Sequence, residues 1–298
     1  MVSKIKLQLS DPFLISLQNY LAFTMNSFYQ ASFGLALASI SFFSHAYSQE
    51  SDPSCSSLGI NPANLAAVDG FCTLTPERYE VNLYEMGLCT SNPIIGNSFS
   101  KDSCIKTISN TSAVALNMAN GNSYALKSQN KVNPPKPGTY GYAYVILEDD
   151  FKLQFSYTLG DKTFYSNGTD SSSSNPVNNV KTSAPSLPFI ETLNDFGDPE
   201  EGFRADASAI VTGGTINALL TDSNLQSVSS SASVTRLIGV YVPTSKVNIT
   251  EETEGLEVKF VVTDQGGGLE VCQDEGGPIF TEICRFGSGP FSARFETF

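Results

Sequence analysis

The sequence predicts an all-β protein, built as an antiparallel β-sandwich with minor helix and stapled by disulfides. Three observations predict this fold: apolar and polar residues alternate over short segments, turn residues separate these segments, and the number of cysteines is even. The charged content of 16% and the absence of Trp are typical of an extracellular β-protein rather than a helical cytosolic enzyme. These patterns allow either one sandwich or two packed β subdomains.

The clearest strand signals lie in the first half of the chain. Arg78–Cys89 opens with strict alternation of apolar and polar residues, which predicts a half-buried strand. Thr139–Leu147 and Phe151–Leu159 also alternate, and the acidic run Glu148–Asp150 separates them. The two segments therefore predict a long antiparallel hairpin with an acidic turn.

Strand signals return toward the end of the chain. The strands expected there cover Val234–Val242, Leu256–Val262, Leu269–Cys272, Ile279–Phe286 and Phe291–Phe298. Short strands separated by frequent turns predict a sandwich or barrel rather than alternating βαβ units.

The chain divides into five parts by composition. They are a signal peptide (1–46), a flexible N-terminal segment (47–76), a first β-rich region (77–165), a Ser/Asn/Pro-rich linker or loop (166–188) and a second β-rich region (189–298). We expect the two β-rich regions to pack in the same sandwich.

The N-terminal part has the order of a signal peptide. Lys4 and Lys6 precede the uncharged apolar run Ala31–Phe43, and the small residues of Ser44–Ala46 follow it. This order predicts cleavage after Ala46, secretion to the extracellular space or cell surface, and no membrane span in the mature chain. A buried N-terminal helix is the alternative interpretation.

The cysteines predict a disulfide framework in an exported chain. Proximity along the sequence favours three bonds, each closing a loop worth about 3 kcal/mol in the chain-entropy model. The three expected pairs are Cys55–Cys72, Cys89–Cys104 and Cys272–Cys284.

Charge and histidine content exclude several functions. The formal net charge of -13 disfavours nucleic acid as a partner, because little in the chain would neutralise phosphates. The only histidine, His45, lies in the predicted leader, so the mature chain would lack a Ser-His-Asp or Cys-His mechanism. We therefore expect a protein that is not an enzyme. A glycosidase that relies on paired carboxylates, such as those of Glu148–Asp150, is the remaining catalytic alternative.

One acidic loop offers hard oxygen ligands for calcium, the single cofactor that the sequence suggests. The candidate ligands are Asp195, Asp198, Glu200 and Glu201, with Asn194 beside them. Their spacing does not match an EF-hand, so a solvated acidic loop is the alternative.

Two stretches carry a resemblance to other proteins. YEVNLYEMGLC with Cys104 after it, and then PGTYGYAYVILEDDFKLQFSYTL, resemble a group of exported proteins from aquatic bacteria over Arg78–Leu159. The resemblance implies export and β-structure, but no activity. More loosely, the whole chain is similar to β-sandwich subunits of extracellular filaments and pili.

These observations favour a structural subunit of a surface filament, fibre or matrix, which assembles with copies of itself by β-strand addition. The terminal strand that carries Phe291, Ala293 and Phe295 on one face is one candidate donor, and Tyr47–Cys55 is a less apolar one.

The alternative is a secreted or surface-attached module that binds glycans or a partner protein, with or without calcium. Its site would combine acidic loops with the row Tyr140, Tyr142 and Tyr144. Core packing is the more common use of such a row.

Overall fold

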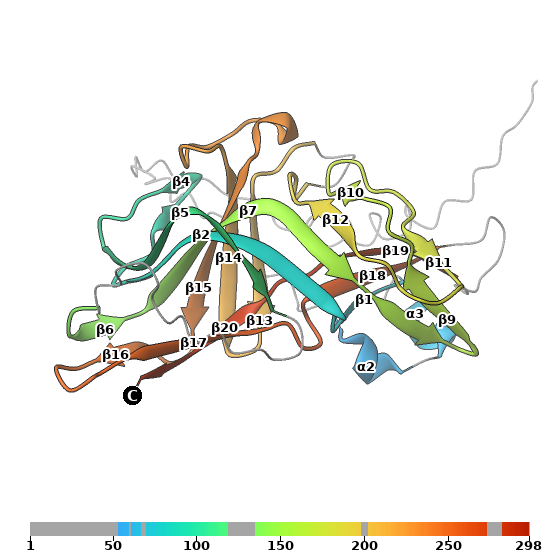
Figure 1. The fold of residues 1–298 in the computed structure, drawn as a ribbon, viewed down its shortest axis with the longest axis horizontal. Coiled ribbons are helices and arrows are strands. Elements are labelled where there is room, and N and C mark those ends of the chain that lie inside the picture. Colours follow the sequence, from blue (N-terminus) through green and yellow to red (C-terminus); the bar gives the residue numbers. More distant parts are fainter. Residues whose placement is uncertain are drawn as a thin grey trace, which may run out of the picture. The chain divides into compact units, whose positions relative to one another are not determined.

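One eight-stranded sheet organises the fold (Figure 1), which a computed structural model describes for residues 53–59, 61–66, 70–118, 135–197, 202–272 and 282–297. Its strands are β2 (Arg78–Cys89), β5 (Cys104–Asn117), β7 (Tyr142–Gln154), β10 (Ser171–Ser172), β12 (Phe189–Thr192), β13 (Asp206–Val211), β14 (Gly214–Thr221) and β15 (Arg236–Pro243). The order is β10-β12-β7-β15-β14-β13, and β2 and then β5 continue the sheet from β7. All neighbours except β10 and β12 are antiparallel.

The remaining strands form smaller sheets. Their groups are β1 (Phe71–Leu74) with β18 (Gly267–Cys272) and β19 (Glu282–Ser288); β17 (Leu256–Val261) with β20 (Ser292–Thr297); β8 (Ser156–Leu159) with β9 (Lys162–Ser166) and β11 (Val180–Lys181); β6 (Gly138–Tyr140) with β16 (Val247–Ile249); and β3 (Ile94–Ile95) with β4 (Ser98–Phe99). Helix is limited to α2 (Cys55–Leu58), α3 (Pro62–Ala66) and the 3-10 turn η2 (Ser231–Ser233). The predicted all-β fold with minor helix is confirmed.

An apolar core joins the main sheet to the smaller sheets around β17, β18, β19 and β20. At its centre Tyr79 of β2 packs edge-on against Phe151 of β7, with ring centroids 5.7 Å apart, and against Phe291 at 6.3 Å. Phe291 also meets Phe260 of β17 at 5.7 Å. Aromatic side chains from both layers therefore interdigitate, as in a sandwich core.

The predicted hairpin at Glu148–Asp150 is wrong, because β7 runs straight through these residues. The strand β2 pairs with β7 from Tyr142 to Gln154. On the opposite edge, β15 pairs with Ala143–Glu148 and β12 pairs with Asp150–Leu153. The turn lies later in the chain, between β8 and β9.

Neighbouring strands explain why an acidic run can continue a strand. The Asn82 side chain donates to the Glu148 carboxylate at 2.5 Å, and the Thr192 hydroxyl donates to the Asp150 carboxylate at 2.6 Å. Arg236 lies opposite Glu148 in the β15 ladder. These side chains hydrogen-bond to the carboxylates in place of the water molecules that would solvate them in an exposed turn.

Two of the expected disulfides are confirmed. Cys55 bonds to Cys72 and Cys89 bonds to Cys104, with Cα–Cα distances of 5.1 and 4.0 Å. Cys284 is also in a disulfide. Its pairing with Cys272, which lies on the neighbouring strand β18, stays a prediction.

The Ser/Asn/Pro-rich segment 166–188 carries the short strands β10 and β11 and is attached to the sandwich. The Asn179 side chain is fully buried and bonds to both backbone groups of Phe286, donating at 2.8 Å and accepting at 2.9 Å. Such a paired amide fastens the segment to β19.

Gly87→Ala is expected to destabilise the protein by about 1–3 kcal/mol, as overpacking of a core typically does. A Cβ atom at Gly87 would lie 2.5 Å from the Ile105 carbonyl oxygen and 2.5 Å from the Tyr144 ring. The matched control is Gly141→Ala, where the nearest atom, in the Lys246 side chain, is 3.9 Å away. Urea unfolding measures both variants, and equal stability of the two would contradict this packing.

Candidate functional site

The strand β13 ends the main sheet, so its outer side has no neighbouring strand among the described residues. Its inner side pairs with β14, and Leu220 N donates to Ala205 O at 2.7 Å where this ladder begins. Backbone groups of alternate residues point to alternate sides of an antiparallel strand. Ser208 and Ile210 therefore turn their N–H and C=O groups toward the open edge, where no described residue hydrogen-bonds to them.

Two other edges of the described sheets are protected. The strand β5 has register irregularities where it pairs with β2, and such bulges discourage further pairing. Along β1, Thr73 N donates to Pro53 O at 3.0 Å, so the segment at Pro53 covers that edge. The β13 edge, in contrast, has no charge, proline or register shift between Ala207 and Val211.

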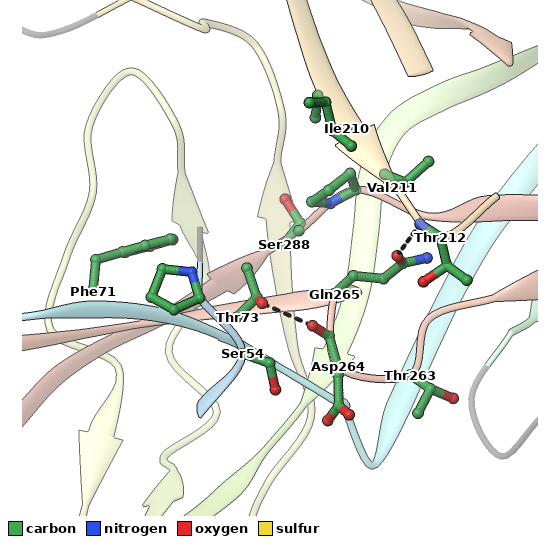
Figure 2. Close-up of a pocket in the computed structure, with 14 residues that line it drawn as sticks. Ser54, Phe71, Thr73, Ile210, Val211, Thr212, Thr263, Asp264, Gln265 and Ser288 are labelled. Carbon is green, nitrogen blue, oxygen red and sulfur yellow. Dashed lines mark hydrogen bonds between the residues drawn. The ribbon is translucent and has the colours of Figure 1, made fainter. Parts of the chain in front are cut away.

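A cleft of about 540 Å³ opens beside β13 (Figure 2). Ile210 on one wall is 53% exposed, and Phe71 on the facing wall is 37% exposed. Two large apolar side chains thus meet water across a gap. Pro53 also lines this cleft.

Polar side chains brace the far end of the cleft. Gln265 is only 8% exposed, and its side chain accepts a hydrogen bond from Thr212 N at 3.1 Å (Figure 2). The same side chain donates to Val261 O at 2.7 Å. The Thr73 hydroxyl donates to Asp264 O at 2.7 Å (Figure 2). The loop that carries Asp264 and Gln265 is therefore fixed to both walls.

An apolar cavity of about 210 Å³ adjoins the cleft along β13. Its lining includes Phe151, Leu193, Phe196, Ala207, Ile216 and Phe291. Cleft and cavity share Ala209 on the strand and Ser288–Pro290 on the floor. We call the two together the β13 groove.

Buried groups hold the floor of the β13 groove. The Tyr79 hydroxyl donates to Gly289 O at 3.0 Å, and Gly289 N donates to Gly266 O at 3.0 Å. The buried Glu191 carboxylate accepts a hydrogen bond from Ser288 N. Burial raises the pKa of Glu191, although the Ser288 bonds and the nearby Arg285 oppose that rise.

The predicted donor strand pairs within its own chain. In β20, Phe295 lies opposite Val258 and Ala293 lies opposite Phe260 of β17. Phe291 and Ala293 are buried, and Phe295 packs against the core. This face therefore belongs to the apolar core of the chain itself.

The tyrosine row is mostly buried, as packing predicts. Tyr144 donates to the Glu85 carboxylate at 2.7 Å, and Tyr140 donates to Lys136 O at 2.7 Å. Both are at most 2% exposed, and Tyr142 is half-buried against the core. A ligand-stacking platform needs exposed rings, and two of these three are covered.

The calcium candidates are only partly described. The Asp195 carboxylate closes its own loop, accepting from Gly197 N at 2.7 Å and Arg204 N at 2.9 Å. Asp198, Glu200 and Glu201 lie outside the described residues. Within the described part of the chain, no group of three His, Cys, Asp or Glu side chains is placed to hold a metal ion.

The contacts of Glu148 and Asp150 argue against a joint catalytic role for the carboxylates of Glu148–Asp150. Glu148 and Asp150 bind the side chains of neighbouring strands, as described above. Burial raises the pKa of Asp149, and the neighbouring carboxylates add to that rise. Raised pKa values suit an acid catalyst, but structural carboxylates in a sheet show them as well.

Sequence reasoning missed the β13 groove. The segment 205–211 carries only a weak strand signal, because small residues such as Ala207, Ser208 and Ala209 fit many conformations. The available signal was the lack of a charge or proline from Ala207 to Val211, which marks an unprotected strand.

Glu191→Gln is expected to raise the free energy of unfolding at neutral pH. Because burial raises the pKa of Glu191, the native protein keeps a proton that the unfolded chain loses above its ordinary pKa of about 4.3. Wild-type stability therefore falls as pH rises through that window, up to the raised pKa. Glutamine can still accept the hydrogen bond from Ser288 N but does not ionise. The stability of the variant should therefore lack this fall with rising pH.

Urea unfolding between about pH 4 and pH 8 measures this difference, with the exposed Glu252→Gln as the control. A Glu191→Gln protein that follows the wild-type slope would contradict the raised pKa.

None of the helices among the described residues has the length and apolar character needed to cross a membrane. Comparisons with protein-family models, with curated proteins and with solved structures gave no match. The resemblance to exported proteins and filament subunits stays a prediction, and the geometry of the β13 groove carries the functional argument.

Proposed function

We propose that the protein is an extracellular structural subunit that assembles by β-strand addition, with the β13 groove accepting a strand from another copy. The observation that carries this proposal is an unprotected sheet edge beside an apolar cavity. Main-chain hydrogen bonds to an edge supply affinity, and pockets for alternate side chains supply specificity. The disulfides and the predicted leader support an extracellular setting.

The groove matches the needs of an added strand. Ser208 and Ile210 offer backbone donors and acceptors, and no described residue uses them. A cavity of about 150 Å³ holds a benzene ring. The apolar cavity of about 210 Å³ is therefore large enough for one aromatic side chain of the incoming strand.

The segment Tyr47–Asp52 is the donor that this geometry favours over the terminal strand. Pro53 and Ser54 line the cleft, so this segment is covalently joined to the rim of the groove. Six residues in extended form span about 20 Å, the length of a typical added strand. Tyr47 would supply the aromatic ring, whereas Phe291, Ala293 and Phe295 of the terminal strand already pack in their own core.

Ile210→Lys is expected to abolish assembly of the mature protein. A lysine in the middle of an edge strand discourages pairing with another strand, because the charge would be buried. The matched control is Ile95→Lys, which adds the same charge at a side chain 75% exposed on β3. Sedimentation and electron microscopy measure the polymers. Equal assembly of the two variants, or a monomeric wild type at high concentration, would contradict the proposal.

Deletion of Tyr47–Asp52 is expected to give a subunit that accepts a strand but cannot donate one. Ile210→Lys gives the opposite subunit, a donor that cannot accept. Each variant alone should stay monomeric, and an equimolar mixture should form heterodimers without longer polymers. Native mass spectrometry measures these species. If the deletion only lowers the stability of a monomer, the segment fills the groove of its own chain, which would contradict assembly.

A further inference from the structure

A second hollow, of about 470 Å³, lies at one end of β20. It is bounded by the turn Thr212–Gly213, by the segment Pro243–Asn248 and by Ala293–Phe295. It shares only Thr212 with the cleft of the β13 groove. We call it the β20 hollow.

The walls of the β20 hollow are held in place by close contacts. Thr244 N donates to Gly213 O at 2.9 Å, which ties the two bounding turns together. Gly213 has a φ of 83°, and a Cβ atom there would lie 3.0 Å from the Tyr241 hydroxyl. The Tyr241 and Phe295 rings stack with centroids 6.3 Å apart. The hollow therefore has a defined shape and an aromatic floor.

The charge of the hollow is opposite to that of the chain. Acidic residues outnumber basic ones 30 to 17 in the sequence, yet the described residues that line the hollow include Lys246 and Arg294 and no acid. The Arg294 guanidinium lies near Tyr241, where its charge opposes the rise that burial causes in the pKa of that tyrosine. Two cations thus converge on one concave surface.

Neither cation is neutralised within the described part of the chain. No ion pair involves Lys246 or Arg294. Opposite Arg294 in the ladder lies Lys259, whose ammonium pairs with Glu296 at 2.7 Å and Glu257 at 3.5 Å. Like charges directly opposite each other destabilise a sheet. A bound anion would reduce the repulsion between Arg294 and Lys259.

We propose that the β20 hollow binds an acidic saccharide, with Lys246 and Arg294 holding its carboxylate or sulfate group. A guanidinium binds such anions through two parallel hydrogen bonds. Neutral hydrogen-bonding groups of Thr244, Ser245 and Asn248 line the same surface and suit sugar hydroxyls. The site does not depend on strand addition at the β13 groove.

Isothermal titration of the mature protein with tetragalacturonate tests the site at low salt. Arg294→Gln and Lys246→Gln are each expected to weaken binding about tenfold or more, as loss of a charged hydrogen bond does. The matched control is Lys152→Gln, which removes the same charge from an exposed lysine without an ion pair. Because the contact is ionic, affinity should fall as salt is added.

Three further titrations decide the ligand class. A sulfated dextran oligosaccharide that binds with the same sensitivity to Arg294→Gln assigns the anionic group to sulfate, and one that does not bind assigns it to carboxylate. If neutral dextran or a poly-glutamate peptide bound with the same affinity as tetragalacturonate, that result would overturn the saccharide assignment. Absence of tetragalacturonate and sulfated dextran binding, or equal loss in Lys152→Gln, would overturn the site itself.

Discussion

The strand β7 has three neighbours, and the rest of the fold depends on how they share its edges. The strand β2 pairs along nearly the whole length of one edge of β7. On the other edge, β15 pairs with β7 before Asp149 and β12 pairs with it after Asp149. The main sheet therefore forks, with β15, β14 and β13 on one branch and β12 on the other. Leu193, which follows β12, and Ala207 of β13 both line the apolar cavity, so residues from both branches contribute to it. The pairing of β7 therefore sets where the two branches begin, and β13 is the last strand of the longer one.

Sequence patterns predicted the features that depend on local order. The alternation in Arg78–Cys89 gave a strand with the observed bounds, and short spacing gave the bonds Cys55–Cys72 and Cys89–Cys104. The sequence patterns failed at Glu148–Asp150. There, acidic residues that favour turns are held in a strand by side chains distant in sequence. The position of β13 at the end of a sheet is likewise a property of the whole topology. No periodicity within the strand reveals which neighbours it lacks.

The β13 groove and the β20 hollow meet at the turn Thr212–Gly213, which contributes to the lining of each. This turn needs glycine, because a Cβ atom at Gly214 would lie 2.3 Å from Val242 O. A tight turn brings β13 against β14 in a fixed register and at the same time sets Tyr241 against the turn. Small residues at one hairpin therefore contribute to the geometry of two surfaces, one that includes an apolar cavity and one that carries two cations.

Gln265 limits how far another strand can pair along β13. Its buried amide already accepts the hydrogen bond of Thr212 N, the backbone group that follows the free edge. Two further bonds, to Val261 and to Ser292, keep this amide from turning away. A strand that lies along β13 must therefore end at Ile210. In the proposed assembly, this bond would therefore limit the register of the incoming chain and determine which of its side chains meets the apolar cavity.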